Sequence, residues 1–164
     1  MTKVTIRDAV AETDAEACAA IYRPFVSDSW VSFETEPPDT DEMARRIADY
    51  GGSHAWLVAQ DGGAIAGYAY GSQHRTRTAY ASSCDVAVYV DPVRARAGIG
   101  RALYEALLPR LAQKYHAAYA GIALPNPASI ALHEAVGFTP VGIYREVGRK
   151  LGNWRDVGWW QKIL

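Results

Sequence analysis

A glycine-rich segment, VDPVRARAGIGRAL at residues 90–103, has the residue types of an anion-binding loop. In it an apolar run ends in Asp-Pro, and arginines and two close glycines precede a helical pattern. Gly98 and Gly100 would let backbone N–H groups approach a ligand at the N-terminus of a helix, which carries a partial positive charge. Arg94 and Arg96 add forked donors. The segment therefore predicts a site for a pyrophosphate.

Two known phosphate-binding motifs require residues that this loop lacks, and an ordinary turn is a further alternative. A Walker A loop ends in Gly-Lys-Ser/Thr, whereas Arg101 and Ala102 follow Gly100. A dinucleotide fingerprint needs a third glycine at the position of Leu103. An ordinary strand-to-helix turn with solvated arginines stays open on this segment alone.

A carboxylate at the start of an apolar strand is the second candidate. In CDVAVYVDP, residues 84–92, Asp85, Ala87 and Tyr89 share one face of the expected strand. Burial among apolar neighbours would raise the pKa of the Asp85 carboxyl towards values useful for accepting a proton from an amine. A salt bridge at the end of a strand is the alternative. Cys84 adjoins Asp85, but no histidine lies close to it in sequence, and we do not expect a covalent acyl-cysteine.

Two further groups of residues could take part in binding or catalysis. In LPNPASIALHEAVGF, residues 124–138, Asn126 stands at a helix start, Ser129 in the first turn and His133 one turn later. Asn126 suits a helix cap, and His133 is either a proton-transfer group or a packed helix residue. Arg75 and Arg77 would face the same side of an extended segment and suit a carboxylate or phosphinate; a solvated hairpin loop is the alternative.

The elements that must position these residues follow from periodicity and turn residues. We expect a strand and helix in residues 5–26, with Thr13 as N-cap, Glu16 completing a capping box and Pro24 kinking or ending the helix. A second helix should follow in residues 35–52 and stop at its two glycines.

The rest of the chain continues this mixed pattern. A hairpin is expected around residues 61–63 and a strand ending at Pro92, then a helix, a short strand and a helix ending at Gly137. Pro109 must kink the first of these helices or mark a break in it. Two strands around a Gly152-Asn153 turn close the chain. This order predicts an α/β or α+β fold, a mixed sheet with helices on its faces.

Composition excludes several classes of protein. Seventeen basic and eighteen acidic residues give a net charge of −1, which offers no electrostatic reason for a nucleic-acid or membrane partner. The apolar runs are far short of a membrane span, and the N-terminus lacks the apolar core of a signal peptide, so we expect a cytoplasmic protein. Cys18 and Cys84 show no metal-ligand spacing, and no metal is expected.

Together the glycine loop and the later Asn-containing helix that ends in Gly-Phe resemble the GNAT superfamily of N-acetyltransferases. RTRTAY at residues 75–80, the acidic residue before VYV, and VGRKLGNWRDVGWWQ at 147–161 narrow the resemblance to the phosphinothricin N-acetyltransferase family. The chain departs from the family pattern at Ala95, where the loop usually has Gln or Arg. It departs again at Asp85, where the family usually has Glu; the loss of one methylene draws the carboxylate back by about 1.5 Å.

The resemblance implies a single domain over residues 1–164, with a mostly antiparallel sheet that splays between its fourth and fifth strands. It also implies acetyl-CoA as co-substrate, a strand bulge at residues 88–90, and a homodimer. Asp85 and His133 would be catalytic. The cofactor would contact Val88, Tyr89, Val90, Arg96, Ala97, Gly98, Ile99, Gly100, Arg101, Asn126 and Ser129, and the acceptor would contact Phe33, Arg75, Thr76, Arg77, Tyr80, Asp85, Val86 and Ala87.

Within this resemblance the acceptor is expected to be an amino-acid analogue with a tetrahedral polar head: phosphinothricin, methionine sulfoximine or sulfone, or an arsenic analogue. Acetylation of a protein N-terminus or a polyamine is an alternative, although a polyamine pocket should be acidic rather than lined by Arg75 and Arg77. A regulatory acyl-CoA-binding module without turnover is another. The tryptophans at 154, 159 and 160 are expected in the core or in a dimer contact.

Overall fold

A computed structural model describes residues 3–164, which form one seven-stranded sheet and four α-helices. The expected order of elements is confirmed. In chain order they are β1 (Thr5–Asp8), α1 (Ala11–Ser27), α2 (Thr40–Ser53), β2 (Trp56–Asp61), β3 (Ala64–Gln73), β4 (Ser83–Val90), α3 (Ile99–Ala112), β5 (Ala117–Ala123), α4 (Pro127–Ala135), β6 (Thr139–Lys150) and β7 (Asn153–Ile163), with 3₁₀ turns η1 (Thr78–Tyr80) and η2 (Pro92–Arg94).

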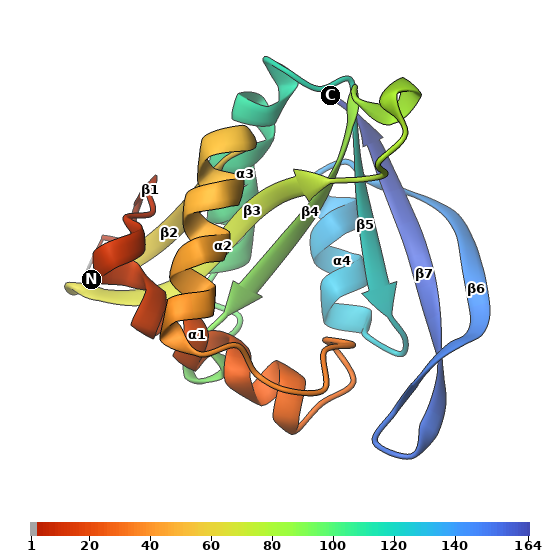
Figure 1. Ribbon diagram of the computed structural model, residues 1–164, viewed down its shortest axis with the longest axis horizontal. Coiled ribbons are helices and arrows are strands. Elements are labelled where there is room, and N and C mark those ends of the chain that lie inside the picture. Colours follow the sequence, from red (N-terminus) through yellow and green to blue (C-terminus); the bar gives the residue numbers. More distant parts are fainter. Residues whose placement is uncertain (1–2) are drawn as a thin grey trace.

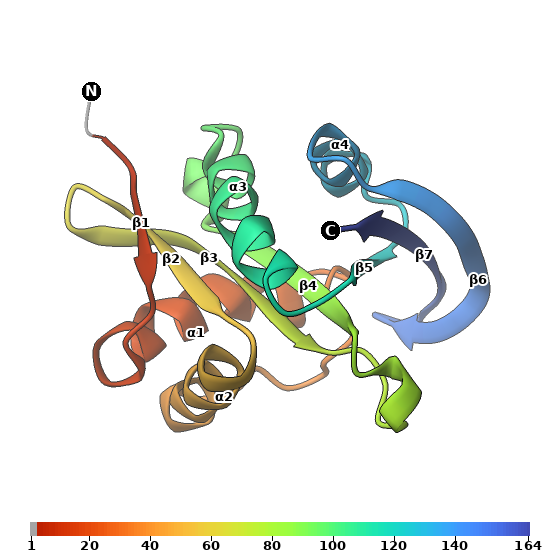
Figure 2. The ribbon, with the colours of Figure 1, turned by 90° about the horizontal axis from the view of Figure 1, so that it is seen from above.

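The strands lie in the order β1-β2-β3-β4-β5-β7-β6, and every neighbouring pair is antiparallel except β4 with β5. Helices α1 and α2 cover one face of the sheet, while α3 and α4 lie on the other (Figure 2). The sheet is therefore the middle of three layers, as the mixed pattern of strands and helices predicts.

Each face of the sheet has its own core. Leu103, Leu107 and Leu111 lie four residues apart on α3 and are buried against the sheet. On the opposite face, Trp56 stacks on Tyr68 and Tyr70 beneath α1 and α2. Both cores meet along β4, whose alternating side chains face the two sides in turn.

The parallel pair β4 and β5 is short. It runs only from Ser83 to Asp85 on β4, paired with Ala117 to Tyr119 on β5, and the strands then diverge (Figure 1). The expected splay between the fourth and fifth strands is confirmed. The expected bulge at residues 88–90 is wrong, because β4 keeps an unbroken register with β3 from Cys84 to Val90. The divergence of β5 by itself leaves one edge of β4 without a strand partner.

The start of α1 differs from the expected one. The helix begins at Ala11 with Val10 as N-cap, and no side chain caps it, so the predicted Thr13 cap is wrong. The Asp14 carboxylate accepts a bond from the backbone N–H of Val10 at 2.7 Å and pairs with Arg7 at 2.7 Å. This buried ion pair ties the first turn of α1 to β1 and takes over the role of the capping box.

Pro24, which was expected to kink or end its helix, does not end it, and the expected Gly-Gly stop also lies inside a helix. Pro24 is within α1, which continues to Ser27, and Gly51 and Gly52 belong to the last turn of α2. The hairpin turn at Gly62 and Gly63 is confirmed, with positive φ at both residues. The final turn is formed by Leu151 and Gly152, one residue before the expected pair; both have positive φ, as a two-residue hairpin turn requires.

Among residues 3–164 no helix has the length and apolar character needed to span a bilayer.

Candidate active site

A cavity of about 480 Å³ lies where β4, the start of α3 and the start of α4 meet. We call it the loop cavity. It is lined by ten of the eleven residues expected to contact a cofactor; the exception is Ala97. These ten are Val88, Tyr89, Val90, Arg96, Gly98, Ile99, Gly100, Arg101, Asn126 and Ser129. The sequence-predicted set is thus brought together by the fold.

The turn into α3 presents backbone N–H groups to the loop cavity. Gly98 is the N-cap of α3 with φ of 76°, and no side chain caps the helix. Arg96 also has a positive φ of 68°. A Cβ on Gly100 would lie 3.0 Å from Leu132 of α4, so the two helices approach closely there. An uncapped helix N-terminus beside a cavity is suited to a phosphate group.

The loop arginines divide between the cavity and the surface. Arg96 and Arg101 line the cavity, and Arg101 also pairs with Glu105 at 2.7 Å. Arg94 instead pairs with Asp61, at the end of β2, at 2.7 Å. Arg94 is therefore occupied in holding the turn to the β2–β3 hairpin, and the expectation that it adds donors for the ligand is not supported by its contacts.

A narrower cavity of about 60 Å³ continues between the diverging strands β4 and β5. Asn126 caps α4 by accepting a bond from the backbone N–H of Ser129 at 3.1 Å, as its position predicted. Tyr104, Ser129 and His133 line the same gap. The splay thus connects the loop cavity to the middle of the sheet.

The His133 imidazole is almost fully buried and uses both ring nitrogens. Nδ1 lies 2.7 Å from the backbone oxygen of Ser129, so it carries the proton and donates. Nε2 therefore accepts a bond from the Tyr104 hydroxyl at 2.8 Å. Burial lowers the pKa of His133, which favours the neutral ring. A direct role for His133 in protonating a leaving group stays a prediction.

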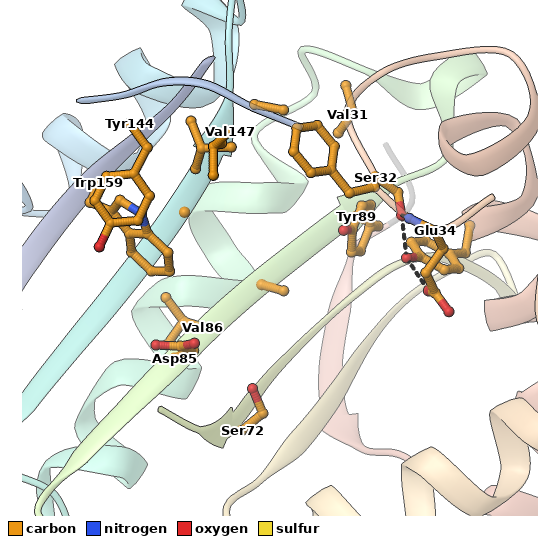
Figure 3. Close-up of a pocket in the computed structure, with 16 residues that line it drawn as sticks. Val31, Ser32, Glu34, Ser72, Asp85, Val86, Tyr89, Tyr144, Val147 and Trp159 are labelled. Atoms are coloured by element: carbon orange, nitrogen blue, oxygen red, sulfur yellow. Dashed lines mark hydrogen bonds between the residues drawn. The ribbon is translucent and has the colours of Figure 1, made fainter. Parts of the chain in front are cut away.

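A larger cavity, of about 630 Å³, opens on the other side of β4 (Figure 3). We call it the strand cavity. Its floor is β4, and its walls come from the loop after α1 and from the β6–β7 hairpin, with Trp159 and Tyr144 opposite Asp85 (Figure 3). Phe33, Asp85, Val86 and Ala87 line it as expected. Among the described residues, the only charged side chains that line it are Asp85 and Glu34.

These two carboxylates are in different electrostatic settings. Glu34 accepts two bonds from the Arg46 guanidinium, at 2.6 and 2.9 Å, and a third from the Tyr22 hydroxyl. The Arg46 contact holds the pKa of Glu34 below its usual range. Burial raises the pKa of Asp85, against the opposing effects of a hydrogen bond from His74 and the charge of Arg75. Asp85 is therefore the better proton acceptor of the two.

His74 is the residue that sequence reasoning missed. Its Nδ1 lies 2.6 Å from Oδ1 of Asp85, although the sequence offered no motif around it. The register of the β3–β4 hairpin pairs Ser72 with Asp85 and Gln73 with Cys84, so His74 follows two residues after the partner of Asp85. That register is the signal that would have placed the imidazole beside the carboxylate.

The RTRTAY segment is not extended, so the same-side argument for Arg75 and Arg77 is wrong. Residues 74, 76 and 77 form bends, and η1 follows. Arg75 lines a fourth cavity, of about 280 Å³, together with His74, Tyr119, Tyr144 and Trp159. We call it the side cavity. The expected acceptor contacts Thr76, Arg77 and Tyr80 line none of the cavities described here.

The loop that carries Phe33 is held by the far end of the chain. Nζ of Lys150 donates to the backbone oxygens of Ser32 at 2.5 Å and Glu34 at 2.6 Å. Gly148 allows the Phe33 ring to lie against the backbone of β6. These contacts explain in part why Lys150 and Gly148 occur in the closing segment.

The three closing tryptophans separate in the fold. Trp160 is buried in the core, Trp154 is 62% exposed, and Trp159 lines both the strand cavity and the side cavity. Trp159 therefore does not fit the expectation of a core position, and a dimer contact for it stays a prediction. Cys84 faces the α3 core, and burial raises the pKa of its thiol to about 12, which does not suit a nucleophile. Among residues 3–164 no group of His, Cys, Asp or Glu is clustered as a metal site would be.

Known proteins are similar to this chain in sequence and in fold. The family model "Acetyltransferase (GNAT) domain" matches residues 7–159. A protein of Streptomyces coelicolor named phosphinothricin N-acetyltransferase is 40% identical over 99% of this chain and 97% of its own length.

Two solved structures have the same fold at full length. One is a GNAT superfamily phosphinothricin acetyltransferase from Sinorhizobium meliloti in complex with AcCoA; it is 38% identical, with a TM-score of 0.93 over 100% of this chain and 89% of its own. The other is titled a ribosomal-protein-alanine N-acetyltransferase from Brucella melitensis and is 33% identical, with a TM-score of 0.93 over 98% of this chain and 99% of its own.

Proposed function

The chain belongs to the GNAT acetyltransferases and is an acetyl-CoA-dependent N-acetyltransferase, and we propose that its acceptor is the α-amine of a small amino-acid analogue such as L-phosphinothricin. The observation that carries the proposal is the position of Asp85. Its carboxylate lies on β4 beside the point where β5 diverges, in a cavity large enough for an amino acid. The name of the Streptomyces coelicolor relative supports the choice of acceptor.

The loop cavity is the proposed site of acetyl-CoA. Its uncapped α3 N-terminus, with Gly98 and Gly100 and the side chains of Arg96 and Arg101, fits a pyrophosphate. The open edge of β4 at residues 86–90 offers backbone groups to the amides of the pantetheine arm. When bound, acetyl-CoA supplies an activated acetyl thioester to this edge.

The strand and side cavities would share the acceptor. Asp85 lies in the first, and Arg75 in the second, and both cavities are lined by Tyr144 and Trp159. An amino acid with its amine at Asp85 would direct an anionic group towards Arg75, which can bind it bidentately. Arg77, Thr76 and Tyr80 are not part of this proposal. Methionine sulfoximine, methionine sulfone and arsenic analogues fit the same description.

The reaction would proceed in three steps, in which named residues of the chain act on the amine and the thioester. Asp85 takes a proton from the ammonium, directly or through water, because only a neutral amine can attack a thioester. The N–C bond then forms and the C–S bond breaks, with the carbonyl oxygen held by a backbone N–H near Val88. The sulfur takes up the second proton of the former ammonium, and His133, which is hydrogen-bonded to Tyr104 beside the splay, would share this proton transfer.

We also propose a homodimer that forms beside the acceptor site. Val141, Ile143, Tyr144, Val147 and Trp154 are all at least 44% exposed on the β6–β7 hairpin. Exposed apolar side chains gathered on one element are typical of an interface. A second copy over this hairpin would cover the mouths of the strand and side cavities.

The experiment that tests the function is identification of the product. Incubation of the enzyme with acetyl-CoA and L-phosphinothricin should yield CoA thiol and the α-N-acetyl compound, identified by mass spectrometry and NMR. Asp85→Asn should bind acetyl-CoA normally and release almost no thiol. A regulatory acyl-CoA-binding module predicts binding without thiol release for any amine, and a peptide acetyltransferase predicts turnover with an N-terminal peptide instead.

A further inference from the structure

Asp85 has a partner that the proposed reaction leaves without a role. The His74 imidazole contacts the carboxylate through Nδ1, and its ring is fixed by three aromatic side chains. It stacks on Tyr119 of β5, with ring centroids 4.6 Å apart, and meets Tyr80 and Trp159 edge-on at 5.9 and 6.2 Å. So many ring contacts hold the imidazole in one orientation, with Nδ1 directed at Asp85.

The contact leaves one carboxylate oxygen for the acceptor. Oδ1 of Asp85 is bound to His74, and among residues 3–164 no other group hydrogen-bonds this carboxylate. His74 lines the side cavity and Asp85 the strand cavity, so the pair spans the wall between them. With Oδ1 bound to His74, Oδ2 is the oxygen left without a hydrogen-bond partner among these residues.

We propose that His74 is a positioning residue for Asp85, with Nδ1–H fixing the short carboxylate so that Oδ2 accepts the proton of the acceptor amine. The inference rests on the proposed function. An aspartate has one methylene less than the glutamate that is usual in the family, and a side chain this short must be held at the right angle to reach an amine. The His74 bond supplies that constraint from the far side.

The proton balance needs no further reactant. An ammonium loses two protons as its nitrogen becomes an amide: one goes to Oδ2 of Asp85 and from there to water, and one ends on the CoA sulfur. His74 keeps its Nδ1–H throughout. Its bond stabilises the carboxylate form, which opposes the effect of burial on the pKa of Asp85.

Other groups that face the pair are mostly uncharged. They are Arg75 of the same loop, Tyr80 of η1, Tyr119 of β5 and Tyr144 of β6. Arg75 is the charged member of this set and, like His74, favours the ionised form of Asp85. A variant that removes His74 therefore leaves Arg75 to act alone.

Two substitutions of His74 distinguish the effect of its hydrogen bond from the effect of its ring packing. His74→Phe keeps an aromatic ring between Tyr119 and Trp159 but removes the donor. His74→Asn loses the ring but places an amide N–H near the position of Nδ1. If the bond positions Asp85, the acidic limb of kcat/KM against pH should move up by about one pH unit in His74→Phe, as the loss of one charge-assisted bond implies. His74→Asn should move it by less than half as much.

His116 is exposed, and His116→Gln serves as the control. It should leave the dependence of kcat/KM on pH unchanged. A His74→Phe profile that coincides with the control, or a shift as large in His74→Asn as in His74→Phe, would overturn the proposal.

A second readout needs no acceptor and no turnover. In ¹H–¹⁵N spectra of the free enzyme at high pH, neutral His74 should carry its proton on Nδ1, and Asp85→Asn should shift it towards the Nε2–H tautomer. Assignment of the signal comes from its loss in His74→Asn. An Nε2–H tautomer in the unaltered enzyme would contradict the inference. If no amine is acetylated, the proposed function fails, while this spectrum still decides whether His74 donates to Asp85.

Discussion

The phenyl ring of Phe33 lies against the backbone of Gly148, and a Cβ at residue 148 would overlap it. Phe33 belongs to the loop after α1, and Gly148 to β6 near the other end of the chain. Lys150 fastens the same loop through its bonds to Ser32 and Glu34. One wall of the acceptor site is therefore built by two segments that are distant in sequence.

This contact predicts a defect in acceptor binding. Gly148→Ala should displace Phe33 and raise the KM for the acceptor about tenfold, since small displacements of positioning groups are costly. The KM for acetyl-CoA should not change. Steady-state kinetics with each substrate varied in turn check this. Gly52→Ala, where a Cβ would meet nothing within 4 Å, is the matched control, and an unchanged acceptor KM in Gly148→Ala would contradict the placement of Phe33.

The turn before α3 predicts an effect on acetyl-CoA binding that can be separated from an effect on stability. Gly98→Ala forces a Cβ into the left-handed region, which costs about 1–2 kcal/mol of stability. It should also displace the α3 N-terminus and raise the KM for acetyl-CoA several-fold. Gly63→Ala carries the same kind of backbone strain, at φ of 87° in the β2–β3 turn. It should cost similar stability by thermal melting without a change in that KM. Equal KM effects in the two variants would contradict the proposed pyrophosphate loop.

Local chemistry made much of the fold predictable. The order of elements, the Asn126 cap and the Gly62-Gly63 turn follow from short-range patterns, whereas the convergence of the glycine loop with α4 was implied only by the family resemblance. The failures came where a distant partner decides the outcome. Thr13 lost its predicted role because Arg7 on β1 draws Asp14 into an ion pair.

The acceptor site was less predictable for the same reason. Asp85 and Phe33 were expected there, but His74, Tyr144 and Trp159 reach it only through sheet register and the β6–β7 hairpin. Arg77 was expected on the assumption of an extended segment, and the bends at residues 74, 76 and 77 remove that basis. The periodicity of a sequence does not determine which residues of two neighbouring strands pair with each other.

The raised pKa of Asp85 predicts the shape of the pH profile. In the proposed mechanism the carboxylate is the active form, so kcat/KM should fall as pH drops through the Asp85 pKa, at a pH above that of an ordinary aspartate. Asp85→Asn should lower kcat/KM by roughly 10²- to 10⁴-fold and abolish this acidic limb. A variant that keeps the limb would show that another group is the base. Circular dichroism and acetyl-CoA binding control for folding.

The Glu34–Arg46 pair predicts a pH-dependent stability. Because Arg46 lowers the pKa of Glu34, the pair stabilises the fold above the unfolded pKa of about 4.3 and loses this effect as pH falls through the lower folded value. Arg46→Met should cost about 1 kcal/mol at pH 7, a figure reduced for partial exposure, and much less below pH ~3.

Urea unfolding at both pH values measures the difference. Arg45→Met removes the neighbouring arginine, which is 66% exposed and pairs with Glu42, and should change stability by less than about 0.5 kcal/mol. An Arg46→Met cost that is the same at both pH values would show that packing, and not the charge pair, accounts for the loss.

The most direct test of the account is CoA release from acetyl-CoA against a panel of amines. The panel holds L-phosphinothricin, methionine sulfone, methionine sulfoximine, glutamate, spermidine and a short peptide with a free N-terminus. We predict turnover with the three tetrahedral-headed amino acids, and far less with glutamate, spermidine or the peptide. Turnover confined to the peptide or spermidine, or none at all while acetyl-CoA still binds, would contradict the proposed acceptor class.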